Sequence, residues 1–368
     1  MDRLPGTRRS AEIDIFRGIA VIGVVFSHTV DGLLSAGALP EGSALHQFND
    51  WFYGFRMPAI ALVLGLFLSY GAEKYGTATY IARRAVFAVY MYLLWYVIQM
   101  GAELATSPWK NTPVTLEDAL RIWAPPAHLW FIPYIAVSAA VIALVAPWRR
   151  APWLTLPLLL AASTATWGWG PDLWGMRGLA LVGFSAVGAV IGMRRMSTVL
   201  TTRAVPVVLV GAAALLLAIP FFGMDLVAAS VPASPEQLAA GRASWLPPSV
   251  ALSWLGQFIL AGLAVALGAI PRVREAFALV GRSTLQIYLA HIIVIAGLRI
   301  VLMRLGVDSL AVLVPTLLVA GVVIPLLAER ILRPTPLRYV FEMPAAWLPG
   351  AAATARRLSE PVHRPRSG

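Results

Sequence analysis

The sequence contains no cysteine and few charged residues. The absence of Cys from all 368 residues excludes disulfides, thiolate catalysis and cysteine-ligated metal sites. Charged residues make up 13% of the chain, whereas a soluble domain has about 25%. Gly-rich loops of the P-loop or dinucleotide-binding type are missing as well. This composition indicates a chain that lies mostly in lipid.

Apolar residues dominate what is present. Hydrophobic residues account for 59% of the chain, and runs long enough to cross about 30 Å of hydrocarbon recur throughout. The first run is too long for a cleavable signal peptide and lacks a small-residue cleavage site, so we expect it to remain as a signal anchor. The sequence therefore predicts an all-α, polytopic integral membrane protein. We expect residues 1–338 to form the membrane-embedded domain and residues 339–368, rich in Pro, Ala and Arg, to form a loosely ordered cytoplasmic tail.

Ten membrane-spanning helices can be drawn, of which the fifth and sixth are short. Their expected ranges are 13–35, 51–72, 80–102, 128–146, 153–168, 178–194, 204–223, 250–270, 284–304 and 309–332.

The basic residues alternate between the connecting loops. Of the 29 Lys and Arg residues, 21 fall in one set of loops and tails, and only Lys110, Arg121, Arg177, Arg242 and Arg304 fall in the other. The positive-inside rule then places both termini in the cytoplasm. The net charge of +11 is explained by this topology and by attraction to anionic lipids, so it does not call for a nucleic-acid partner.

Ionisable residues interrupt the first apolar segment. Asp14, Arg17 and His28 lie within it, and eleven positions on a helix place Arg17 and His28 about 20° apart around the axis and about 16 Å apart along it. Asp14 is an i,i+3 neighbour of Arg17. Charged groups inside a membrane span are costly and usually face a wet cavity or a functional site. A snorkelling Arg17 and a packing role for His28 are the simpler alternatives for each residue alone.

Further candidates lie near the ends of the spans. Asp31 follows His28 by three positions; it could orient the imidazole, or be a solvated loop residue, which we favour. Arg56 precedes Met57-Pro58 at the second span and could instead snorkel within an aromatic belt. His128 and Trp130 open the fourth span, where a belt again explains the Trp.

Tyr288 and His291 lie one helical turn apart in the ninth span. A hydrogen-bonded packing pair is as reasonable for these two residues as a functional site.

These landmarks resemble the membrane-bound acyltransferase 3 family. The resemblance rests on the opening signature Glu12-Ile-Asp14-Ile-Phe-Arg17-Gly18 and on the ten residues that stand between Arg17 and His28. Met57-Pro58, His128-Leu-Trp130-Phe131 and Ser283-Thr-Leu-Gln-Ile-Tyr288-Leu-Ala-His291 follow in family order. The chain departs from the family at Leu64-Gly65, where Ser-Gly is common, and at Arg83 and Arg84, which are adjacent rather than spaced.

The resemblance implies transfer of an acyl group, acetyl in the simplest case, from cytoplasmic acyl-CoA to a hydroxyl of a sugar, surface polysaccharide or glycoside. His28 would act as general base, with Asp14 and Arg17 supporting it, and an acyl-histidine intermediate stays an alternative. Donor binding would involve Arg17, Arg83, Arg84, Tyr288 and His291, and acceptor binding Asp31, Arg56, His128 and Trp130. The expected partners are acyl-CoA, a carbohydrate acceptor and the lipid bilayer of a bacterial cytoplasmic membrane, with no metal.

A transporter or flippase without acyl-transfer chemistry is the competing interpretation. Buried Arg, His and Asp side chains would then form a substrate path or a proton relay. Inverted repeats or broken helices would favour it, and the sequence shows no convincing pair of them.

The 21-to-five distribution of loop cations predicts that both termini lie in the cytoplasm, and reporter fusions at either end would test this. An alkaline phosphatase fusion after Arg338 should be inactive and a fluorescent-protein fusion there bright. A tail found outside the cell would contradict the topology.

Overall fold

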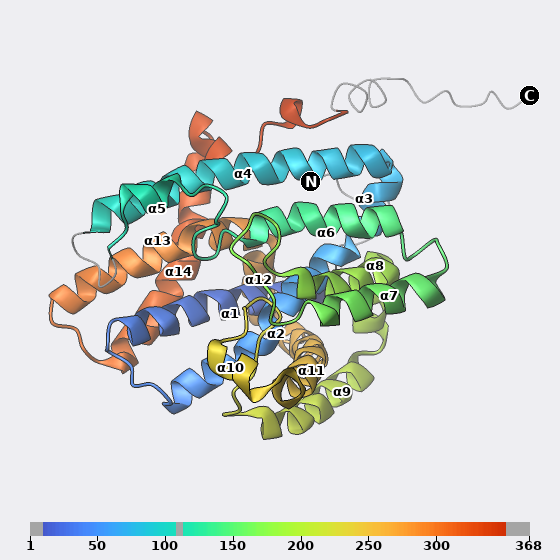
Figure 1. Ribbon diagram of the computed structural model, residues 1–368, viewed down its shortest axis with the longest axis horizontal. Coiled ribbons are helices and arrows are strands. Elements are labelled where there is room, and N and C mark those ends of the chain that lie inside the picture. Colours follow the sequence, from blue (N-terminus) through green and yellow to red (C-terminus); the bar gives the residue numbers. More distant parts are fainter. Residues whose placement is uncertain (1–9, 108–112, 351–368) are drawn as a thin grey trace, which may run out of the picture.

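Helices connected by loops make up the part of the chain that a computed structural model describes, residues 10–107 and 113–350, and no strand occurs in it. The helices are α1 (Ala11–Ser35), α2 (Ala44–Leu66), α3 (Leu68–Tyr75), α4 (Thr77–Thr106), α5 (Leu116–Leu120), α6 (Phe131–Val145), α7 (Pro152–Ala165), α8 (Val182–Thr202), α9 (Ala204–Ala218), α10 (Pro235–Ala240), α11 (Arg242–Gly268), α12 (Pro271–Arg282), α13 (Thr284–Arg304) and α14 (Leu310–Leu332) (Figure 1).

Eight helical stretches are long and apolar enough to cross a membrane: Ala11–Ser35, Ala44–Tyr75, Thr77–Thr106, Leu179–Thr202, Ala204–Phe221, Arg242–Gly268, Thr284–Arg304 and Leu310–Leu332. The helices Phe131–Val145 and Pro152–Ala165 are apolar but shorter. The all-helical, polytopic fold is thus confirmed. The count of ten spans and the cytoplasmic position of the termini remain predictions.

Several expected boundaries were wrong. The second helix begins at Ala44 rather than at residue 51, because the Ser43 side chain accepts a hydrogen bond from the His46 amide and caps it. The sixth span is not short, since a helical turn and α8 together run over Leu179–Thr202. The hydropathy pattern also failed to predict α12, because the charged residues of this helix lower its average hydrophobicity.

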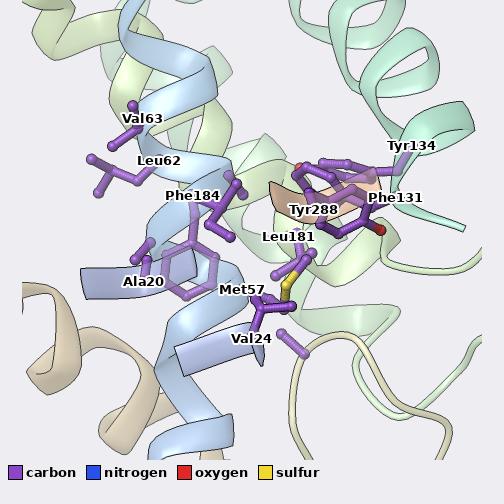
Figure 2. Packing of buried hydrophobic residues seen from close by; sticks show 14 of the residues in the cluster. Ala20, Val24, Met57, Leu62, Val63, Phe131, Tyr134, Leu181, Phe184 and Tyr288 are labelled. Carbon is purple, nitrogen blue, oxygen red and sulfur yellow. The ribbon is translucent and has the colours of Figure 1, made fainter. Parts of the chain in front are cut away.

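The first helix lies inside the bundle. It packs against α2, α11, α12, α13 and α14, and Figure 1 shows α1 and α2 crossing the middle of the molecule. Figure 2 shows how Ala20 and Val24 of α1 and Met57 of α2 lie near Phe184 and Tyr288 in the buried apolar cluster. This enclosure keeps the ionisable residues of α1 among protein groups rather than lipid.

Glycines allow two helices to approach closely. A Cβ at Gly65 of α2 would collide with the backbone of Ser185 on α8, and one at Gly188 of α8 would collide with the backbone of Leu62 on α2. Small residues at such contacts are typical of membrane helix pairs, because close packing replaces the hydrophobic driving force that lipid removes.

The start of the expected tail packs against the bundle. The Tyr90 hydroxyl donates to the Tyr339 carbonyl at 2.8 Å, and Trp95 Nε1 donates to the Val340 carbonyl at 2.7 Å. Phe341 is buried against Trp95. Residues up to 350 are therefore ordered on α4, contrary to the expected loose tail. The remaining tail residues, 351–368, lie outside the described part of the chain, and the domain division at 338 remains a prediction.

Replacing Gly65 by Ala should destabilise the protein, because its new methyl group cannot avoid the Ser185 backbone. We expect a cost of about 1–3 kcal/mol, typical of overpacking, seen as a lower melting temperature in detergent. Gly297→Ala on α13 is the matched control, since nothing lies within 4 Å of its Cβ position. Equal melting temperatures for the two variants would contradict the α2–α8 contact.

Candidate active site

A cavity of about 280 Å³ lies beside His28. Residues from α1, α2, α13, the segment before α6 and the loop between α7 and α8 line it. The lining side chains include Val24, His28, Asp31, Tyr53, Arg56, Met57, Ala127, His128, Trp130, Arg177 and Tyr288. Segments distant in the sequence thus meet around one histidine of the first helix.

Three imidazoles form a cluster at this cavity. The ring centroids of His28 and His291 are 5.2 Å apart, those of His128 and His291 are 4.9 Å apart, and those of His28 and His128 are 6.3 Å apart. The His28 side chain is 23% exposed, while His128 and His291 are buried. Within residues 10–107 and 113–350, no group of three or more His, Cys, Asp or Glu is arranged to hold a metal ion.

Backbone carbonyls fix the tautomers of the two buried imidazoles. Nδ1 of His291 lies 3.0 Å from the Ile287 carbonyl and 2.8 Å from the Tyr288 carbonyl, and Nε2 of His128 lies 3.2 Å from the Leu289 carbonyl. Because a carbonyl can only accept, these nitrogens carry the hydrogens. Nε2 of His291 and Nδ1 of His128 have no hydrogen-bond partner in the described chain, so each neutral ring keeps one buried acceptor.

Tyr288 joins α13 to the segment before α6. Its hydroxyl donates to the carbonyl of His128, and the two rings are in edge contact with centroids 5.0 Å apart. Phe131 packs on the same tyrosine. This contact holds His128 beside the cavity.

Asp31 belongs to a short polar network at the outer part of α1. Its Oδ2 lies 4.0 Å from Nδ1 of His28, and its Oδ1 accepts from Asn49 Nδ2 at 3.1 Å. The Ser27 hydroxyl donates to the Asn49 side-chain oxygen. Asp31 is therefore a helical residue of the cavity wall and not the loop residue that we favoured, although its side chain is 46% exposed.

Two arginines border the cavity. Arg56 is 1% exposed, and its guanidinium lies 3.5 Å from the centroid of the Tyr53 ring. Arg177 lies over Trp130 at 5.6 Å, donates from Nε to the Ser230 carbonyl at 3.3 Å, and approaches Asp172 at 3.7 Å.

A second polar network surrounds the beginning of α1. Arg17 donates from Nε to the Gly281 carbonyl and approaches Asp14 at 3.4 Å. Arg282 approaches the other oxygen of Asp14 at 3.8 Å. Asp14 therefore links two arginines and ties α1 to the end of α12, about 21 Å along the helix from His28.

Arg83 and Arg84 lie on α4, away from the cavity. Arg83 donates from Nη1 to the Pro349 carbonyl at 2.9 Å and stacks on Tyr75 at 4.3 Å. Arg84 lies over Tyr80 at 5.1 Å. The C-terminal segment thus uses one donor group of Arg83.

A family profile described as an acyltransferase domain matches residues 10–330. The chain belongs to the acyltransferase 3 family. No curated protein and no solved structure matches it significantly. Membership of this family makes the protein a membrane acyltransferase.

The structure of this acyltransferase 3 protein separates the expected site residues into two groups. The cavity gathers His28, Asp31, Arg56, His128, Trp130 and Tyr288, with His291 behind them. Asp14 and Arg17 lie at the other end of α1, and Arg83 and Arg84 lie on α4. Tyr288 lines the cavity with His28, and His291 lies 5.2 Å from His28 between ring centroids; their expected role in donor binding remains a prediction.

Sequence reasoning missed Tyr53, Asn49 and Arg177. Tyr53 precedes Arg56 by one helical turn and could have been found by that spacing. Arg177 was counted only as an outer-loop cation. The Trp- and Gly-rich loop that carries it gives no local sign that it folds over the cavity, so no feature of the sequence would have identified Arg177.

Proposed function

We propose that the protein transfers an acyl group, acetyl in the simplest case, from cytoplasmic acyl-CoA to a hydroxyl of a sugar, polysaccharide or glycoside acceptor in a bacterial cytoplasmic membrane. The partly exposed His28 imidazole in the wall of the cavity is the observation that carries the proposal. Its position after the family signature at Arg17 supports it.

In the proposed reaction His28 takes the proton of the acceptor hydroxyl as its oxygen attacks the thioester carbonyl. The C–S bond then breaks, and the acyl group stays on the acceptor. The CoA thiolate leaves and takes the proton from the His28 imidazolium. Asp31 lies at 4.0 Å from Nδ1, beyond hydrogen-bond distance, but such contacts often tighten when substrate binds. An oriented imidazole with Nδ1 toward Asp31 would use Nε2 as the base.

His128 and His291 support His28 rather than replace it. Both are buried and have one nitrogen committed to a backbone carbonyl. Their remaining nitrogens can accept a hydrogen bond from a hydroxyl and so orient the acceptor.

The donor is expected to arrive from the end of α1 that carries Arg17. Its phosphates would meet Arg17 and the Arg83–Arg84 pair through charge-assisted hydrogen bonds. On α13, Gln286 lines a small cleft with Arg333 and Arg338, while Tyr288 lines the cavity. Gln286 and Tyr288 are two residues apart, which is about 3 Å along the helix axis, so only about half a turn of α13 separates the basic edge from the proposed catalytic centre.

Changing His28 to Ala should reduce acyl transfer by about 10²–10⁴-fold, the usual contribution of a general base. Release of CoA would be followed with a thiol reagent, which reacts with no group of this cysteine-free protein. His46→Ala is the matched control, since His46 lies at the start of α2 beside Asp50 at 3.4 Å and does not line the cavity.

Near-full turnover by a folded His28→Ala protein would remove the assigned role and direct attention to His128. Failure of the wild-type protein to consume acetyl-CoA in an acceptor-dependent way would favour the transporter.

Arg17→Ala should weaken binding of CoA by about 2 kcal/mol, the value of one charge-assisted contact. Isothermal titration would measure it, and a melting curve would report any loss of the Arg17–Gly281 contact. Arg83→Ala tests the second proposed contact, and Arg121→Ala is the control because that exposed arginine pairs with Glu117 in an outer loop by the predicted topology. Unchanged CoA affinity in a folded Arg17→Ala variant would leave Arg17 as a link between α1 and α12.

A further inference from the structure

Arg56 is a buried cation without a matching anion. It lines the cavity from the fourth turn of α2 and is 1% exposed. Its Nε and Nη1 have no hydrogen-bond partner in the described chain, and no carboxylate there lies within 4.0 Å of its guanidinium. Tyr53 covers one face of the group. A desolvated guanidinium that lacks an ion pair costs several kcal/mol, so the surroundings of Arg56 need an explanation.

The cavity as a whole is poor in negative charge. Arg56 and Arg177 are its cationic wall residues, and Asp31 is its one carboxylate among the lining residues. Asp31 already accepts from Asn49 and faces His28. Arg177 has its own partners in Asp172 and the Ser230 carbonyl. Asp31 and Asp50 attract the Arg56 charge only from beyond ion-pair distance. Arg56 is therefore the cavity cation that has no close ion pair, and its Nε and Nη1 donors remain available to a ligand.

Arg56 lies near the proposed acceptor site rather than near the residues proposed to bind the donor. Arg56 shares the cavity with His28. Of the arginines proposed for the CoA phosphates, Arg17 lies about 16 Å from His28 along α1, and Arg83 and Arg84 lie on α4 outside the cavity lining. Trp130 and Tyr288 supply aromatic surface in the same cavity. The volume of about 280 Å³ lies near the lower end of small-molecule sites, which span roughly 300–1,000 Å³, and suits a group of one sugar unit.

We propose that the acceptor carries an anionic group, a carboxylate or a phosphate, which Arg56 binds while the hydroxyl to be acylated approaches His28. This inference rests on the proposed function and narrows its acceptor to acidic glycans or glycosides. A neutral sugar could accept hydrogen bonds from the two N–H donors, but it would not neutralise the positive charge of Arg56. An anion would accept these hydrogen bonds and also neutralise the charge. Charge-assisted hydrogen bonds are about twice as strong as neutral ones.

Three methyl glycosides that differ in one group test the proposal on the purified full-length protein. Methyl glucuronide carries a carboxylate, methyl glucoside is neutral, and its 6-phosphate carries a phosphate. Isothermal titration in the absence of acyl-CoA measures binding alone. We expect at least one charged glycoside to bind about tenfold or more tightly than the neutral one, since one contact to a charged group is worth about 1.5–3 kcal/mol. Which charged glycoside binds best identifies the anion.

Arg56→Gln should remove that preference and raise KM for the charged glycoside more than it lowers kcat, whereas Arg56→Lys should keep part of it. Arg121→Gln changes an exposed arginine that does not line the cavity and should alter neither value. If Arg56→Gln does not fold, the proposal is tested by whether the wild-type protein binds a charged glycoside more tightly than the neutral one.

Equal binding of charged and neutral glycosides would overturn the proposal. An equal fall of kcat on every glycoside in Arg56→Gln would overturn it too and would assign Arg56 to the tetrahedral oxyanion. Selective binding without any release of CoA would instead refute the proposed acyl transfer and leave the anion site standing.

Discussion

The polar groups of α1 need partners inside the protein, and the neighbouring helices are arranged to supply them. Lipid offers no hydrogen bonds, so each intramembrane polar group that lacks a partner costs several kcal/mol. At one end of the helix Asp14 and Arg17 meet Arg282 and the Gly281 carbonyl of α12. At the other end Ser27 and Asp31 meet Asn49 of α2. Arg299 of α13 donates to a carbonyl of α1 beyond them.

The two ends of α1 differ in how completely this requirement is met. Near Arg17 the side chains are joined in ion pairs and backbone contacts. Near His28 several buried polar atoms have no partner in the described part of the chain, namely Nε and Nη1 of Arg56, Nδ1 of His128 and Nε2 of His291. A buried polar group without a partner needs an explanation, and a catalytic role or a bound water or ion is among the usual ones. The first network therefore holds α1 in the bundle, and the second leaves donors and acceptors open to the proposed substrates.

Under the proposed function, the same arrangement would let a donor and an acceptor from opposite sides of the membrane meet. Arg17 and His28 share a stripe of one helix but lie about 16 Å apart along it. α13 brings Tyr288 and His291 to the cavity while Gln286 contacts the basic cleft of Arg333 and Arg338. An acyl chain crossing this short distance would leave its charged carrier near the basic edge. The C-terminal segment, through the contact of Arg83 with the Pro349 carbonyl, borders the same edge.

The sequence by itself determined the all-helical membrane fold, the family and most of the residues around the cavity. The expected segments 284–304 and 309–332 agree closely with Thr284–Arg304 and Leu310–Leu332, because transfer into lipid depends on local composition. Only the tertiary structure revealed α12, the ordered segment up to 350, and Arg177 and Tyr53 at the cavity. Amphipathic segments and loops take their positions from long-range packing, which a hydropathy window does not contain. The grouping of His28 with His128 and His291 likewise needed three separate segments to fold together.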